Sequence, residues 1–171
     1  AGEALEMSYR TRRSQRVFSS DRNQLTFILP AAQAPAPGAV EIDRSATIAR
    51  AVQSVAEAAA AGASLVVLPE SFIPGYPSWI WRLAAGKDGA VIGQLHTRLL
   101  ANAVDIVNGD LCQLCEAARV HAVTIVCGIN ECDRRNGGGT LYNSVVVIGV
   151  NGAGLYRHRK LMPSNPERSV H

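Results

Sequence analysis

The hydrophobic pattern becomes regular from Asp43 onward and predicts an α/β protein. Asp43 or Ser45 can cap a helix. The apolar positions of that helix recur at the 3.6-residue period and are Ile48, Val52, Val55 and Ala59. Gly62 can adopt the left-handed conformation that ends such a helix. Residues 64–68 then form a continuous apolar run, which is typical of a strand buried on both faces. A helix followed by a buried strand is the alternation of an α/β fold.

Similar patterns predict the remaining elements. The apolar segment that starts at Leu25 predicts a first strand, and Pro30 confines it to a sheet edge or a bulge. Further helices are expected over residues 90–102 and from 108 or 110 to 121, and further strands over 122–127, 141–150 and 155–159. Asn151-Gly152 is a favoured dipeptide for a two-residue hairpin turn between the last two strands.

Composition narrows the class of protein. The 171 residues carry a formal charge of +3, with 47% hydrophobic and 18% charged residues. This apolar content is enough for a core and excludes wholesale disorder, and the charge is too small for a dedicated nucleic-acid binder. No apolar run approaches the ~18 residues that span a bilayer. Four cysteines do not make a disulfide scaffold, so we expect a soluble, cytoplasmic protein.

The two ends of the chain differ from its middle. Residues 1–24 are polar and arginine-rich, and we interpret them as a disordered leader in front of a domain over residues 25–171. A signal peptide is the alternative, because residues 32–34 imitate a cleavage site, but the apolar stretch before them is very short. The chain begins with Ala1 and stops at His171, directly after a charged stretch that looks like a motif. We therefore expect a fragment.

Glu70 is the first candidate for chemistry. It follows the predicted buried strand, and ligands of open α/β folds bind beside the carboxyl ends of strands. An aromatic segment stiffened by prolines comes next, and its Tyr76 and Trp79 can wall an apolar substrate pocket. A carboxylate in such a place suits a general base. The alternative is a solvent-exposed glutamate in a loop, because most glutamates in proteins are exposed.

The basic stretch over residues 156–168 contains the second candidate pair. Lys160 stands at the end of the strand expected over 155–159, where its ammonium can face a developing negative charge. Glu167 follows a turn with two prolines and can return to pair with Lys160. An ordinary basic strand end at the surface is the alternative. No pattern in the sequence brings Glu70 and Lys160 together.

Two long stretches resemble signature sequences of the nitrilase family of carbon–nitrogen hydrolases. They are Leu65-Val-Val-Leu-Pro-Glu-Ser-Phe-Ile-Pro-Gly-Tyr-Pro77 and His158-Arg-Lys-Leu-Met-Pro-Ser-Asn-Pro-Glu-Arg168. Segments 98–105 and 139–144 between them also resemble nitrilase sequence, in the order of the family. The resemblance runs from about residue 31 to residue 171, and residues 1–29 have no counterpart in it.

The resemblance implies an α-β-β-α sandwich, incomplete here because the carboxy-terminal half is absent, and a Glu-Lys-Cys triad. Carried over by motif, Glu70 is the general base, Lys160 stabilises the charged intermediates, and Glu167 helps to position the reacting groups. The family's nucleophilic cysteine stands in a Cys-Trp-Glu context, which this chain does not contain. The resemblance implies neither a metal nor an organic cofactor.

The chain's own cysteines are poor substitutes for that nucleophile. Cys112 and Cys115 have the spacing of a redox pair or of half a zinc site, but no second pair has zinc-ribbon spacing. We interpret them as small buried hydrophobes. Cys127 lies within a predicted strand and lacks the Trp-Glu that follows the family's nucleophile.

The sequence therefore predicts the amino-terminal part of a nitrilase whose intact form hydrolyses a nitrile to a carboxylic acid and ammonia. The partners expected are a small-molecule nitrile and, in the full-length protein, other copies of itself, with no nucleic acid and no membrane. An amidase or a cyanide-converting member of the superfamily is an alternative, since the triad is shared. A truncated, inactive product that only associates with full-length subunits is another. Without its nucleophile, the chain alone is expected to be inactive.

Overall fold

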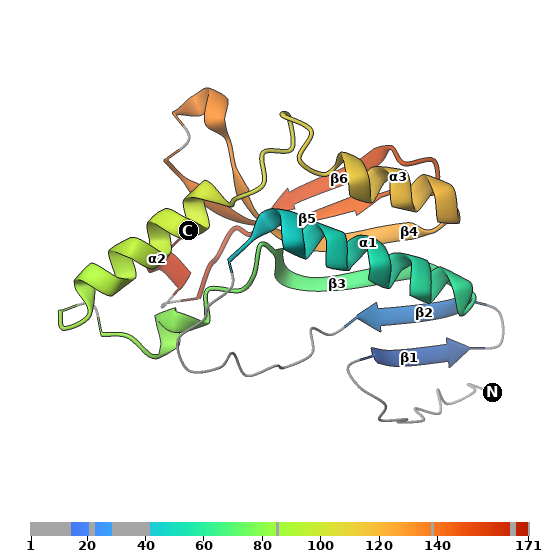
Figure 1. Ribbon diagram of the computed structural model, residues 1–171, viewed down its shortest axis with the longest axis horizontal. Coiled ribbons are helices and arrows are strands. Elements are labelled where there is room, and N and C mark those ends of the chain that lie inside the picture. Colours follow the sequence, from blue (N-terminus) through green and yellow to red (C-terminus); the bar gives the residue numbers. More distant parts are fainter. Residues whose placement is uncertain are drawn as a thin grey trace.

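One six-stranded sheet in the order β1-β2-β3-β4-β5-β6 forms the centre of the molecule (Figure 1). The computed structural model describes residues 15–20, 23–28, 42–84, 86–137, 139–164 and 167–170. The strands are β1 (Gln15–Ser20), β2 (Asn23–Ile28), β3 (Ala63–Ile73), β4 (Thr124–Cys132), β5 (Leu141–Ile148) and β6 (Gly154–Arg159). Strands β2, β3 and β4 are parallel, whereas β1, β5 and β6 pair antiparallel with their neighbours. The predicted mixture of helices and a sheet is therefore confirmed.

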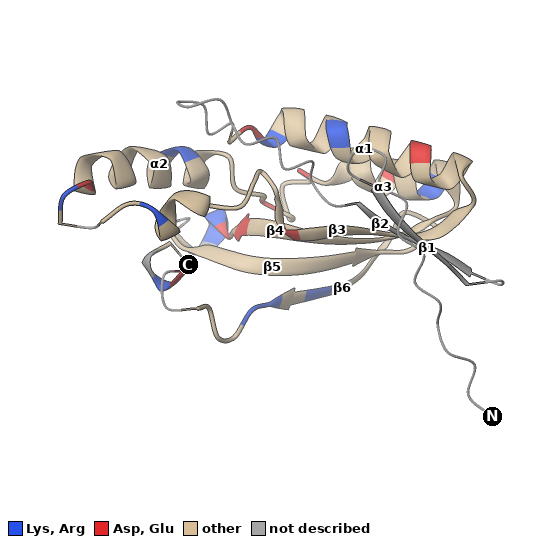
Figure 2. Cartoon of the chain, turned by 90° about the horizontal axis from the view of Figure 1, so that it is seen from below, with Lys and Arg blue, Asp and Glu red and all other residues tan. Residues whose placement is uncertain are grey.

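Three helices connect the parallel strands. Helix α1 (Arg44–Ala60) joins β2 to β3, and helices α2 (Gly89–Ala101) and α3 (Cys112–His121) join β3 to β4. Parallel neighbours need such long crossovers because a tight turn can join only antiparallel strands. All three helices lie on the same side of the sheet (Figure 2). In the part of the chain that the structure describes, no helix combines the length and apolarity needed to cross a bilayer.

Helix α1 follows its sequence pattern closely. The Asp43 side chain accepts a hydrogen bond from the Ala46 N–H at 2.9 Å, which confirms Asp43 as the N-cap. Ile48 and Val55 are buried in the core between the helix and the sheet. Gly62 follows the helix with a φ of 91°, the left-handed conformation predicted for it.

The two faces of the sheet have different environments. Val66 and Leu68 of β3 are buried under the helices, as alternate positions of a strand should be. Leu65 and Val67 point to the other face and are only half-buried. The prediction that residues 64–68 are buried on both faces was therefore wrong for the described molecule, because its helices cover one face only.

The β5–β6 hairpin has a three-residue loop instead of the predicted two-residue turn. Gly149 N–H donates to the Ala153 carbonyl at 2.9 Å, and Gly152 N–H donates to the Gly149 carbonyl at 2.8 Å. Gly152 has a φ of 78°, the left-handed position of a type I turn followed by a bulge. This loop sets the register in which Ser144 stands opposite Arg159.

Strand β1 is the main element that the sequence analysis did not predict. It lies within residues 1–24, which were interpreted as a leader, and it pairs with β2 along its whole length. Strand β2 covers most of the apolar segment that starts at Leu25, so the predicted first strand exists as the second one. Pro30 lies outside the described residues.

Candidate active site

A bulge in β3 brings Glu70 to the edge of a cavity. Leu68 pairs with Cys127 of β4 and Ile73 with Ile129, so five steps along β3 match two steps along β4. The extra residues arch over Gly128, where a Cβ atom would lie only 2.2 Å from the Pro69 carbonyl oxygen. Glycine at this position therefore permits the close approach of the two backbones. Glu70 lies inside the observed strand, although the sequence placed it after the strand end.

Lys160 connects the two glutamates that the sequence analysis singled out. Its ammonium Nζ donates to Glu70 Oε1 at 2.8 Å and to Glu167 Oε2 at 3.0 Å. The hydrogen bond to Glu70 is the main reason that the pKa of Lys160 is raised, and the bond to Glu167 adds to it, whereas burial acts against it. Lys160 is therefore a stable cation near neutral pH. Glu70 and Lys160, 90 positions apart, converge as the triad hypothesis requires.

Glu167 is a buried carboxylate with several donors around it. Burial alone would raise its pKa, but the Ser164 backbone N–H at 2.7 Å and the Lys160 ammonium outweigh burial and lower the pKa of Glu167 to about 2. Its other oxygen accepts a hydrogen bond from the Tyr76 hydroxyl at 3.3 Å. Trp81 Nε1 donates in turn to the Tyr76 oxygen at 3.1 Å. Glu167 is thus ionised and held in place over the physiological pH range.

A cavity of about 350 Å³ lies beside Glu70 and Lys160. Val67 lines it and points away from the core under the helices, so the cavity opens on the other face of the sheet. Its apolar floor includes Val67 of β3, Val126 of β4 and Val145 of β5, which are neighbouring strands. Its polar groups come from Glu70, Asn143, His158 and Lys160. An apolar floor with a few converging polar groups is the usual form of a small-molecule site.

Asn143 of β5 was not recognised as a site residue from the sequence. Its side-chain Nδ2 donates to Glu70 Oε1 at 2.7 Å, and its backbone carbonyl accepts from the Lys160 N–H at 2.7 Å. The segment 139–144 had been noted only for its likeness to nitrilase sequence. An amide residue in a strand that ends in four apolar residues was the available signal.

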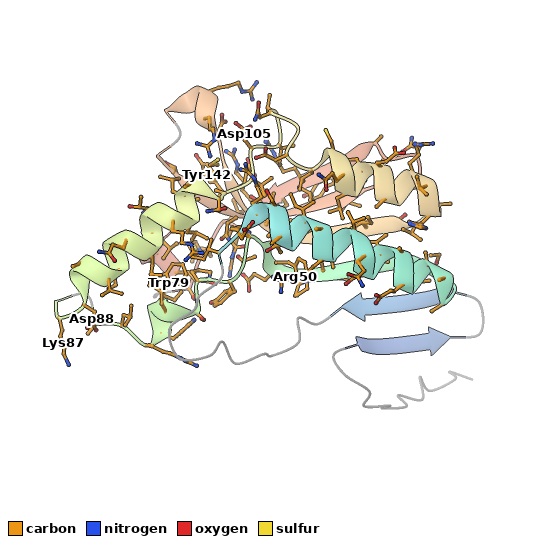
Figure 3. The ribbon with its side chains drawn as sticks, viewed as in Figure 1. Arg50, Trp79, Lys87, Asp88, Asp105 and Tyr142 are labelled. Carbon is orange, nitrogen blue, oxygen red and sulfur yellow. The ribbon has the colours of Figure 1, made fainter. Side chains whose placement is uncertain are left out.

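The two aromatic residues proposed for the pocket lie elsewhere. Tyr76 contacts Glu167 and is not among the residues that line the cavity. Trp79 packs in a second core cluster with Leu99 of α2 and with Ala103, which follows that helix, and is 4% exposed (Figure 3). Its assignment to the substrate pocket is therefore corrected. The pattern of aromatic residues indicated burial, but it did not show which cluster would bury the side chain.

None of the four cysteines lines the cavity. Cys127 points from β4 into the core under the helices, and burial raises the pKa of its thiol far above the ordinary value. Burial also raises the pKa of Cys115, and the neighbouring Cys112 adds to this effect. A thiol with a raised pKa forms little of the nucleophilic thiolate. Among the described residues, no group of three His, Cys, Asp or Glu residues is placed to hold a metal ion.

A sequence model of the family described as carbon-nitrogen hydrolase matches residues 29–171. The chain is 38% identical over 146 residues to an aliphatic nitrilase of Rhodococcus rhodochrous, a match that covers 85% of the chain and 37% of the relative. It is 33% identical over 131 residues to an arylacetonitrilase of Aspergillus oryzae, covering 77% of the chain and 36% of the relative. The chain thus spans little more than a third of the curated relatives it matches.

Solved structures with the same arrangement are more distant in sequence. The NitFhit protein of C. elegans matches with a TM-score of 0.50 and 17% identity, over 71% of the chain and 25% of that protein. An N-terminal amidase solved with a Gln-Gly peptide matches with a TM-score of 0.51 and 17% identity, over 72% of the chain and 26% of that protein. These likenesses confirm the expected fold, of which this chain covers only a part.

Proposed function

The chain belongs to the carbon–nitrogen hydrolase family, and from this premise we propose that it is part of a nitrilase. The intact enzyme would hydrolyse a nitrile to a carboxylic acid and ammonia. One observation carries the proposal: the Lys160 ammonium joins Glu70 and Glu167 beside a cavity with an apolar floor. The nitrilase names of the relatives at 33–38% identity support nitriles as the substrate class.

In the proposed reaction, Glu70 acts as the general base. It accepts the proton of a cysteine thiol while the sulfur attacks the nitrile carbon, so that a C–S bond forms, one C–N π bond breaks and the nitrogen is protonated. Glu70 then activates water, which expels ammonia and afterwards releases the acid from the thioester. Two water molecules are consumed for each nitrile, and the thiol is restored.

Lys160 and Glu167 have complementary roles in this scheme. Because the pKa of Lys160 is raised, its ammonium stays charged and stabilises the negative charge that develops on the reacting nitrogen or oxygen. Glu167 stays ionised and accepts a second hydrogen bond from the Lys160 ammonium, in addition to the one accepted by Glu70. Its negative charge offsets the cost of keeping the cation in a partly enclosed site.

The nucleophile is proposed to come from outside these 171 residues, because the four cysteines lie away from the cavity. We further propose that residues 25–171 form one part of the catalytic domain, that the intact enzyme is a cytoplasmic homo-oligomer, and that the remaining part covers the open face of the sheet. The chain alone is then inactive.

The test uses the intact enzyme, that is, this chain together with the sequence encoded after His171. That sequence is expected to include Cys-Trp-Glu. With a panel of aliphatic and aryl nitriles, we expect equal amounts of ammonia and carboxylic acid from the intact enzyme and neither product from the 171-residue chain. Hydrolysis of the matching amides without any turnover of nitriles would assign an amidase instead. Turnover of nitriles by the 171-residue chain would show that the nucleophile has been misplaced.

A further inference from the structure

Asn143 contacts both proposed catalytic residues of this chain, in two different ways. Its side-chain amide donates to the Glu70 carboxylate and its backbone carbonyl accepts from the Lys160 N–H, each at 2.7 Å. We infer that Asn143 is a positioning residue, which turns Glu70 so that only its Oε2 atom is left to accept the proton of the nucleophile. This inference rests on the proposed function, in which Glu70 is the general base.

The need for a positioning residue follows from the surroundings of Glu70. Its side chain is 48% exposed and stands on a bulge, so its own packing does little to restrict its rotamers. Asn143, by contrast, is 5% exposed and pairs with Asn130 of β4. A buried residue therefore holds an exposed one. A general base must lie within about 3 Å of the proton it removes, so this restriction bears directly on the rate.

The hydrogen bonds to Glu70 distinguish its two carboxylate oxygens. Within the described part of the chain, the donors to Glu70 are Asn143 Nδ2 and Lys160 Nζ, and both end on Oε1. An oxygen that already accepts two short hydrogen bonds is the weaker proton acceptor of the pair. Oε2 is consequently the basic atom.

The amide of Asn143 is suited to this task because it is neutral. Its NH₂ group, and not its oxygen, must face the carboxylate, since two acceptors would repel each other. An aspartate of the same shape would place a second carboxylate beside Glu70, where two like charges cannot both ionise easily. The isosteric Asn143→Asp substitution therefore removes the orienting donor while it keeps the size of the side chain and the backbone contact to Lys160.

A cross-linking measurement tests the geometry without any need for activity. A carbodiimide joins a carboxylate to a lysine amine in direct contact, with loss of water, and the chain has only two lysines. In the 171-residue chain, we expect a Glu70–Lys160 link and a Glu167–Lys160 link, identified by peptide mass, in material whose intact mass is that of a single chain. Asn143→Ala should lower the ratio of the first link to the second about fivefold or more, because Glu70 then samples several rotamers.

Asn151→Ala is the matched control for this measurement. Asn151 lies in the loop of the same hairpin, is exposed, and its side-chain oxygen accepts from the Ala153 N–H within the loop. Its replacement should leave the ratio of the two links unchanged. An unchanged ratio in Asn143→Ala, in a variant whose circular dichroism shows that it is folded, would overturn the inference. This result does not depend on whether the intact enzyme acts on nitriles.

Kinetics of the intact enzyme provide the second measurement. We expect Asn143→Asp to lower kcat about tenfold to a hundredfold with a change of less than about threefold in KM, the pattern of a misplaced reacting group. The acid limb of its pH–rate profile should move to higher pH. If Asn143 had only a structural role, Asn143→Asp would lower the melting temperature and leave kcat and the pH profile unchanged. That outcome would overturn the inference, and it can be measured even if Asn143→Ala does not fold.

Discussion

Replacement of Lys160 by Met in the intact enzyme is expected to lower kcat for a nitrile about a hundredfold to a thousandfold, the usual cost of one donor to a developing negative charge. Methionine has a similar length and no charge, so the volume of the side chain is largely kept. The loss should appear in kcat and in kcat/KM alike, because the ammonium acts mainly on the transition state.

A second consequence of Lys160→Met concerns Glu167. The ammonium is one of the groups that lower the pKa of Glu167 to about 2, so this pKa should rise in the variant. The pKa is measurable by NMR of the labelled carboxyl carbon. Lys87→Met is the matched control, since Lys87 is exposed in the loop before α2 and lies far from the sheet (Figure 3). Near-normal turnover in Lys160→Met would contradict the role given to this ammonium.

Replacement of Glu131 by Ala is expected to have the largest effect on stability. Glu131 of β4 is 1% exposed and faces away from the cavity. One oxygen accepts from Arg159 Nε at 3.1 Å and Arg157 Nη1 at 3.3 Å, and the other from Ser144 Oγ at 2.8 Å. The bond to Glu131 is also the main reason that the pKa of Arg159 is raised. This buried carboxylate therefore ties edge strand β6 to the sheet directly before Lys160.

The expected loss in the free energy of unfolding is about 3 kcal/mol, at the lower end for a broken buried ion pair. The lower end applies because the Arg159 side chain is 30% exposed and can regain water when its partner is removed. Denaturant unfolding of the intact enzyme measures the loss. Glu116→Ala is the control, because Glu116 pairs with Arg119 on the exposed face of α3, where little change is expected. Equal unfolding midpoints for both variants would contradict the anchoring role.

Much of the fold was predictable because local rules and tertiary packing agree. The spacing of Ile48 and Val55 and the cap at Asp43 predict α1 without knowledge of the rest of the chain. Strands β2 to β5 were recognised from apolar segments, but their ends were not, and β1 was missed. Strand β3 continues through the Pro69-Glu70 step as a bulge, and a bulge depends on the close approach of Gly128 from the neighbouring strand.

The site was less predictable from patterns alone. Glu70 and Lys160 were each named from a position at a predicted strand end, but only the resemblance to a family joined them in one site, since β3 and β6 are separated in the sheet by two other strands. Asn143 and Glu131 were missed for a common reason. A polar residue in a strand indicates a polar contact on one face of the sheet, but it does not identify the residue that makes the contact. Trp79 was misplaced because aromatic character indicates burial without indicating the neighbours that provide it.

The most direct test of the account is to locate the covalent intermediate. In the intact enzyme, rapid acid quenching during turnover of a nitrile should trap the covalent intermediate, which mass spectrometry of the protein and of its peptides can locate. We predict that the adduct maps to a cysteine that follows residue 171 in the chain. An adduct on Cys112, Cys115, Cys127 or Cys132 would contradict the proposal that Glu70 and Lys160 serve a nucleophile from outside this segment.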